Sequence, residues 1–480
     1  PGKHEYFYTN EEDGTLHIYS ASLKNNTPKQ LTFFKGNPVR YVSVSGNGTV
    51  CFSYNGELYT MKAGAEPKKV EISIVTDQVE NPIQDRTLSS GARSMAVSPN
   101  GKEVAVILRG DVYVTTVDHS TTKRITNTPQ QERDLWFSKD GKTLYYSAER
   151  NGHWGIWATS LTEKGDKYFT YALKMEEKQV SKPGETCFQP QVSPDGKLLA
   201  YLKDRTAIAV MDLKSGKEKI LLDKSINYSY VDGDQSFSWS PDSRYIAYSC
   251  RKLTGKKYAF STNTEIYIYN VETAECEVID MKGGYDTDPV WSPDGSKIAW
   301  VSMERDGYEA DKQRLMMAYV DWTKGEPMVW GITDATEDFK YNAAGPGWSA
   351  DSKNLYFNSL AEGVQGMFVA KGPDFEAPAG SKIKPAPWKV ERITDEDFWY
   401  DFGSPFHVVN EADGGMTLYT TWCSMDFPTE LAAVKIEKEG TEYKQITKEN
   451  EHILSQLAEH ETEARYVKTV DGKEMLTGVL

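Results

Sequence analysis

Short apolar runs recur along the whole chain, and each is separated from the next by a polar turn. Residues 103–108 and 297–301 are two such runs, and a second run follows each of them closely. They are rich in Val, Ile, Tyr and Trp and too short for helices, which is typical of β-strands. A third run often ends in Leu-Thr or Ile-Thr, as at 125–126. With the apolar stretch before each turn, the pattern predicts four antiparallel strands per repeat.

The turn between the first two strands has a recurring sequence, Ser-Pro-Asp-Gly or a close variant. It occurs at 45–48, 98–101, 138–141, 193–196, 240–243, 292–295 and 349–352, with a degenerate copy at 412–414. Proline presets φ, aspartate hydrogen-bonds to nearby backbone, and glycine accepts a positive φ, so each copy is a tight turn. A spacing of roughly 50 residues is typical of propeller arrays.

We therefore predict an all-β fold, a β-propeller of four-stranded antiparallel blades with WD40-like repeats. We expect eight blades, and seven or nine stay open as alternatives. The propeller should span residues 1–447, with a partial first blade at 5–32 and the repeats at 39–447. Residues 448–480 should form a short helix, near 451–461, and closing or connecting strands. A tail strand that completed the partial blade would give nine.

The composition of the chain excludes several classes of function. The chain has 480 residues, 12% aromatic residues and a net charge of −15, so it should fold and should repel phosphate backbones and anionic membranes. No apolar run approaches the ~20 residues of a membrane helix. The chain begins with Pro1 and carries no apolar leader, so we expect a processed or trimmed chain.

Residues with catalytic or metal-binding chemistry are scattered. The five cysteines never stand in C-x-x-C spacing, so we expect small buried strand residues, although a Cys250–Cys276 bridge stays open. The seven histidines form no His-Glu-x-x-His motif, and the acidic turns 232–234 and 286–288 are best explained as turn caps. No serine or cysteine lies in a Gly-x-Ser-x-Gly type motif. We predict no catalytic residue, no metal site and no cofactor.

Two families resemble the chain, and the resemblances meet at the turn 240–243. Residues 1 to about 240 resemble the propeller of Bacteroidetes tricorn-type peptidases, through GDVYVT (110–115), KRITNTPQQER (123–133) and NYSYVDGDQ (227–235). Residues 243–480 resemble the propeller of the prolyl oligopeptidase family, in its dipeptidyl-peptidase-like branch, through IAYSCRK (246–252) and SMERDGYE (302–309). In that family TVDGKEM (469–475) marks the entry to an α/β-hydrolase domain. A natural fusion, an engineered chimera and an intermediate family stay open.

These resemblances imply a function. The chain would be the non-catalytic, substrate-gating propeller of a periplasmic or secreted serine peptidase, and it would admit only short peptides to a hydrolase domain that it lacks. Its partner would be a peptide substrate, reached through that domain, and a homo-oligomer stays open; no nucleic acid or membrane is expected. Alone, the chain should hydrolyse nothing. The alternatives are a free-standing TolB-like propeller that binds a protein or ligand, and a tricorn-type fragment that needs a partner chain.

One charged segment, 304–312, stands out between two predicted strands. Dipeptidyl peptidases hold the amino group of their substrates with propeller carboxylates, so the resemblance implies Glu304 and Glu309 as substrate contacts, with Arg305 between them. Arg251 and Lys252, on the preceding repeat, would pair with this segment or face a substrate carboxylate. A solvated hairpin loop is the alternative. Tryptophans at repeat-equivalent positions, such as Trp239, Trp291 and Trp348, should pack between blades.

Overall fold

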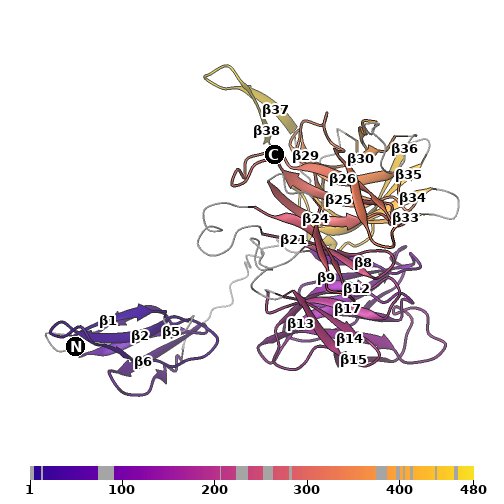
Figure 1. The fold of residues 1–480 in the computed structure, drawn as a ribbon. Helices are drawn as coiled ribbons and strands as arrows, with labels where there is room; N and C mark the ends of the chain where they lie inside the picture. The colour runs from indigo at the N-terminus through magenta and orange to yellow at the C-terminus, as the bar shows by residue number, and fades with distance from the viewer. Residues whose placement is uncertain are drawn as a thin grey trace. The chain divides into compact units, whose positions relative to one another are not determined.

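The computed structural model describes residues 5–11, 15–73, 91–205, 207–222, 236–251, 263–279, 284–373, 386–395, 400–403, 406–410, 415–437, 440–458 and 463–479. These residues form ten β-sheets and one short helix, so the predicted all-β fold is confirmed (Figure 1). Within the described ranges, no helix has the length and apolar character needed to cross a bilayer. The chain divides into two compact units, 1–86 and 87–480, and each is described by itself.

The first unit contains two antiparallel sheets that share one apolar core. The first sheet has three strands, in the segment where we predict a partial blade, and the second has four. Their strands are β1 (Glu5–Asn10), β2 (His17–Ser22) and β3 (Pro28–Gln30), then β4 (Arg40–Val44), β5 (Thr49–Tyr54), β6 (Glu57–Lys62) and β7 (Lys68–Lys69). Ile18 of one sheet and Val50 and Phe52 of the other lie in the core between them.

The second unit contains seven sheets of four or five strands, which we number blade 1 to blade 7 in chain order, and one two-stranded sheet after them. Blades 1 to 3 are β8 (Ala92–Val97), β9 (Glu103–Leu108), β10 (Asp111–Thr116) and β11 (Thr122–Arg124); β12 (Glu132–Phe137), β13 (Thr143–Arg150), β14 (His153–Leu161) and β15 (Met175–Gln179); and β16 (Cys187–Val192), β17 (Leu198–Lys203), β18 (Ala207–Asp212) and β19 (Glu218–Leu222). Blades 4 and 5 are β20 (Phe237–Trp239), β21 (Tyr245–Cys250), β22 (Glu265–Asn270) and β23 (Cys276–Val278); and β24 (Tyr285–Trp291), β25 (Lys297–Met303), β26 (Arg314–Asp321) and β27 (Met328–Asp334). Blades 6 and 7 are β28 (Ala344–Trp348), β29 (Asn354–Ala361), β30 (Val364–Lys371) and β31 (Lys389–Arg392); and β32 (Asp401–Phe402), β33 (His407–Asn410), β34 (Met416–Cys423), β35 (Glu430–Glu437) and β36 (Gly440–Gln445).

The remaining elements follow blade 7. They are the helix α1 (Glu451–Leu454) and the strands β37 (Glu463–Lys468) and β38 (Glu474–Val479), which pair with each other as a two-stranded sheet. Ile453 and Leu454 on the helix are only half-buried. Among the described strands, therefore, this hairpin stands apart from the four-stranded repeats.

Apolar clusters join the seven blades in a cycle. Each pair of consecutive blades shares one cluster, and a further cluster joins blade 7, through Tyr419 and Leu431, to blade 1, through Met95 and Val104. The amide of Ala92 also donates to the carbonyl oxygen of Thr429 at 2.8 Å across this junction. The second unit is thus a closed ring of seven blades, held by packing between its first and last sheets. The blade number of the whole chain stays a prediction.

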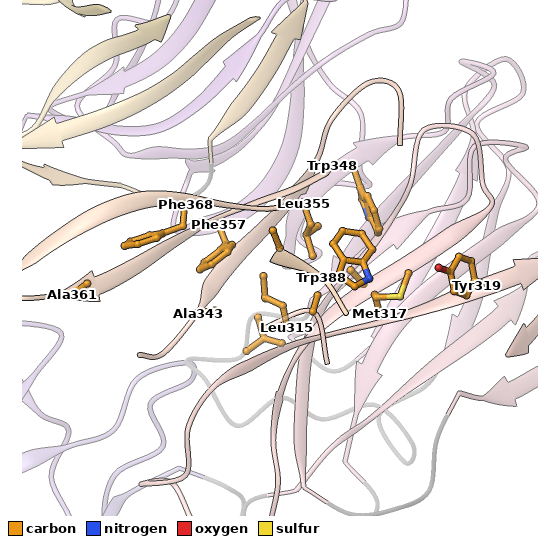
Figure 2. Close-up of a cluster of buried hydrophobic side chains, with 14 residues drawn as sticks. Leu315, Met317, Tyr319, Ala343, Trp348, Leu355, Phe357, Ala361, Phe368 and Trp388 are labelled. Atoms are coloured by element: carbon orange, nitrogen blue, oxygen red, sulfur yellow. The ribbon is translucent and has the colours of Figure 1, made fainter. Parts of the chain in front are cut away.

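The cluster between blades 5 and 6 shows how the repeats pack. Leu315 and Met317 of blade 5 lie against Leu355 and Phe357 of blade 6, with Trp348 beside them (Figure 2). The indole Nε1 of Trp348 donates to the carbonyl oxygen of Val290 at 3.1 Å. Trp239 and Trp291 lie in the corresponding clusters between blades 3 and 4 and between blades 4 and 5, as predicted.

The Ser-Pro-Asp-Gly turns have the predicted local chemistry. In blade 3 the hydroxyl of Ser193 donates to Asp195 Oδ1 at 2.7 Å and accepts from the Leu198 amide at 2.9 Å. Gly196 has a φ of +81°. In blade 4 a serine takes the glycine position: Ser243 has a φ of +65°, and its hydroxyl accepts from the Asp195 amide of the preceding blade at 2.9 Å. That bond offsets the strain of a left-handed serine.

Because neighbouring strands of each blade run in opposite directions, the connections between strands lie at two opposite ends of the ring. The turn end carries the Ser-Pro-Asp-Gly turns and the connections between third and fourth strands, and the loop end carries the other connections. First strands of consecutive blades contact one another, as β8, β12 and β16 do, so they form the inner wall. The chain enters the ring at Ala92 and leaves it after Gln445, and both residues lie at the loop end.

The cysteines all lie on strands, but their burial differs. Cys187 and Cys250 are buried, Cys51 and Cys423 are half-buried, and Cys276 is exposed. All five are free thiols, so the bridge between Cys250 and Cys276 does not form. The expectation of uniform burial is wrong for Cys276, because it lies on the outermost strand of blade 4.

Candidate functional site

The predicted substrate contacts lie at the loop end of two adjacent blades. Arg251 directly follows β21 of blade 4, while Glu304, Arg305 and Glu309 lie in the connection between β25 and β26 of blade 5. Arg251 is half-buried, whereas the other three side chains are exposed. Lys252 lies outside the described residues. Blade order therefore brings the two segments to the same end of the ring.

The connection in blade 5 has its own internal order. The Arg305 guanidinium binds Asp311, with Nε 3.1 Å from Oδ1 and 3.0 Å from Oδ2, and its carbon lies 4.0 Å from the centre of the Tyr308 ring. This bond lowers the pKa of Asp311 and raises that of Arg305. Arg305 thus holds the shape of the loop. In sequence Glu304 directly precedes Arg305, and Glu309 lies between Arg305 and Asp311.

Both ends of the same loop are tied to the blade. Asp306 Oδ1 accepts from the Gly284 amide at 2.7 Å, and Lys312 Nζ donates to the carbonyl oxygen of Thr336 at 3.0 Å. Gly284 has a φ of +111°, and a Cβ there would lie 1.9 Å from the carbonyl oxygen of Met303. Only glycine fits at position 284, where the backbone passes close to the Met303 carbonyl group. Glu304 and Glu309 therefore lie in a loop whose two ends are anchored to the blade.

A second group of side chains at the loop end was not found from the sequence. The Phe188 ring of blade 3 lies under two guanidinium groups, with the Arg205 carbon 4.3 Å and the Arg133 carbon 5.5 Å from its centre. Trp154 of blade 2 lies 5.4 Å from the same ring. These residues come from three strands and one turn of two blades, so no local motif marks them.

Beside this group, a buried ion pair supports blade 2. Glu132 is fully buried, and its Oε1 lies 2.7 Å from Arg150 Nη1. Arg150 also lies 5.3 Å from the centre of the Trp157 ring. Burial raises the pKa of Glu132, although Arg150 and the hydroxyls of Thr126 and Thr128 act against this shift. The pair is enclosed, so its role is structural.

Comparison with known proteins shows which proteins this chain is similar to. Residues 58–261 match the family described as TolB beta propeller domain. The chain is 29% identical to dipeptidyl-peptidase 5 of Porphyromonas gingivalis over 444 residues, which are 82% of this chain and 59% of that protein. It is 30% identical to dipeptidyl-peptidase 5 of Porphyromonas endodontalis over 489 residues, which are 96% of this chain and 62% of that protein.

Tricorn protease of Thermoplasma acidophilum is also similar, with 23% identity over 303 residues, which are 62% of this chain and 26% of that protein. Both predicted resemblances are thereby confirmed. The similarity to dipeptidyl-peptidase 5 extends along 96% of this chain rather than its second half alone. The chain spans about three fifths of the length of these dipeptidyl-peptidase relatives.

Proposed function

We propose that this chain is the substrate-gating propeller of a serine peptidase similar to dipeptidyl-peptidase 5. One observation carries the proposal. The ring is entered and left at the loop end, and the candidate substrate contacts of blades 4 and 5 lie at this same end. A catalytic domain continuing from the chain would therefore meet those contacts directly.

Gating would be steric. The inner wall consists of first strands that are bonded between blades: Gln191 Nε2 donates to the carbonyl oxygen of Phe237 at 3.1 Å, and Ser238 Oγ donates to that of Pro289 at 2.7 Å. Such bonds resist widening of the ring. A peptide could pass or be held at the loop end, whereas a folded protein could not reach a nucleophile beneath the ring.

Glu304 and Glu309 would bind the free amino group of the peptide, with Arg305 as the positioning residue. Arg251 would face a carbonyl or carboxylate of the same peptide. Membership of a peptidase of this kind further suggests a periplasmic or secreted location.

The test uses the parent protein, with the hydrolase domain that we propose to follow Leu480. Glu304→Gln with Glu309→Gln should raise KM about tenfold for peptides with a free amino terminus and leave N-blocked peptides unchanged. Glu272→Gln, an exposed glutamate at the turn end, is the matched control. An unchanged KM would remove the two glutamates from the proposal. A coding sequence that stops at Leu480, or labelling of the isolated chain by a fluorophosphonate probe, would overturn the gating role itself.

The second candidate function is a free-standing scaffold that binds a protein or ligand, and the TolB match over 58–261 favours it. A stop codon after Leu480 together with a specific partner bound by the isolated chain would support it. A downstream Gly-x-Ser-x-Gly motif would count against it.

A further inference from the structure

Equivalent grooves between blades differ in what covers them at the turn end. The groove between blades 1 and 2 is covered by the connection between β14 and β15, residues 162–174. Phe169 of this connection is fully buried, and its ring lies 5.9 Å from that of Phe137. The buried Glu103 carboxylate accepts from the amides of Phe169 and Thr170 at 3.1 and 2.8 Å. The connection is thus firmly anchored.

The same connection exposes two large apolar side chains. Tyr171 is 62% exposed and Leu173 is 92% exposed, whereas Ala172 between them is 1% exposed. Lys164, Lys167 and Lys174 surround this tip in sequence and are also exposed. Lys174 Nζ lies 3.3 Å from Glu163. We call residues 164–174 the knob. It is a basic, apolar projection on a chain whose net charge is −15.

The groove between blades 4 and 5 is covered less completely. Trp322, which directly follows β26, lies where Phe169 lies in the other groove: its ring centre is 5.6 Å from that of Tyr245 and 6.0 Å from that of Trp291. There Tyr245 occupies the position that Glu103 occupies in blade 1, five residues after the turn serine. The connection between β26 and β27, residues 322–327, is much shorter than the knob connection and leaves a cavity of about 300 Å³. Tyr245, Ile268 and Pro327 form its apolar floor, and three exposed glutamates line its rim: Glu275, Glu277 and Glu326.

We propose that the knob of one copy of this chain inserts into the groove between blades 4 and 5 of a second copy. Tyr171 and Leu173 would lie on the apolar floor, and the knob lysines would meet the rim glutamates. Burial of two exposed apolar side chains provides the driving force, and the opposite charges select the partner. Arg244, which lies over the Tyr245 ring, is paired with Asp242 and leaves the rim acidic.

The fold allows this contact to form twice in one dimer. The knob lies between blades 1 and 2, the groove lies between blades 4 and 5, and both lie at the turn end among the outer strands. A two-fold axis that places two turn ends face to face exchanges two such sites, so each knob meets the groove of the other copy. Self-complementary pairing of this kind is how two-fold interfaces close. The second contact then forms within the complex and strengthens the first.

Sedimentation of the chain over a range of concentrations tests the proposal. The unchanged chain should dimerise, and Leu173→Asp or Glu326→Lys should each weaken dimerisation at least about tenfold. Leu360→Asp, at another exposed leucine, in blade 6, should not. Mixing the Leu173→Asp and Glu326→Lys chains should restore part of the association, because one knob and one groove remain intact in the mixed dimer.

Charge exchange separates loss of contact from loss of folding. Lys167→Glu with Lys174→Glu should abolish the dimer, and adding Glu275→Lys with Glu326→Lys to the same chain should restore it. A chain that remains monomeric up to about 100 µM would overturn the proposal. So would a dimer that Leu173→Asp and Glu326→Lys leave unchanged, or a charge exchange without rescue.

Discussion

The two ends of the seven-bladed ring are built on different principles. At the turn end the same hydrogen bond from a serine hydroxyl to an aspartate carboxylate recurs. Its length is 2.7 Å between Ser138 and Asp140, 2.7 Å between Ser292 and Asp294, and 2.5 Å between Ser349 and Asp351. At the loop end each connection differs, from the tight hairpin after Arg150 to the anchored loop 304–313. Repetition stabilises blades 1 to 6 in the same way, and variation at the loop end leaves room for recognition.

The sharpest test of the comparison replaces one glycine at each end. Gly284→Ala, at the loop end, should cost about 3–5 kcal/mol, because its Cβ would collide with the Met303 carbonyl group at an unfavourable φ. Gly295→Ala, at the turn end, should cost only about 1 kcal/mol, because its Cβ would have ordinary contacts. Urea unfolding measures both. Equal losses would mean that the loop-end crossing is not tight.

A smaller effect is expected from a single turn serine. Ser193→Ala removes the hydroxyl that donates to Asp195 and accepts from Leu198, so we expect a loss of about 1–2 kcal/mol in the free energy of unfolding. Ser215→Ala is the control, since Ser215 also bonds an aspartate, Asp212, but in an exposed turn. If the two variants unfold alike, the repeated turn bond contributes no special stability.

The turn aspartates predict how acid affects the ring. Burial acts to raise the pKa of Asp195 and Asp294, but hydrogen bonds from serine hydroxyls and backbone amides outweigh it and lower the pKa. A lowered pKa in the folded state adds stability above the unfolded value, about 3.9, which is lost as pH falls through the folded pKa. Asp195→Asn should reduce the loss of stability between about pH 5 and pH 2, as followed by thermal unfolding. A steeper acid transition in this variant would contradict the assignment.

The smallest effect on stability is expected within the loop of blade 5. Arg305→Ala removes the ion pair between the exposed Arg305 guanidinium and the largely covered Asp311 carboxylate, so the thermal midpoint should fall only slightly. The loop should nevertheless lose order, and chymotrypsin should cut faster after the exposed Tyr308. Arg465→Ala, which removes an exposed pair with Glu463, is the control. Unchanged cleavage would show that Arg305 does not hold the loop.

Much of the fold could be predicted because the interactions that form its turns and strands join residues close together in the sequence. Each turn is made by bonds that join residues at most five positions apart, as from Ser193 to Leu198, and each strand has its own apolar pattern. The loop 304–312 could likewise be singled out, because its charges stand together in the sequence. Arg305 shows the limit of this approach: the sequence marked it as a substrate contact, and the structure turns its guanidinium toward Asp311.

The sequence by itself determined the four-stranded repeat, its turns and the absence of a recognisable nucleophile motif. Only the tertiary structure decided that blade 7 packs on blade 1, that Arg133 and Arg205 both lie over the Phe188 ring, and that a long connection covers one groove through Phe169 while a short one leaves a cavity at an equivalent groove. The physical reason is distance along the chain. These contacts join residues tens to hundreds of positions apart, and they depend on how neighbouring sheets pack rather than on any short run of residues.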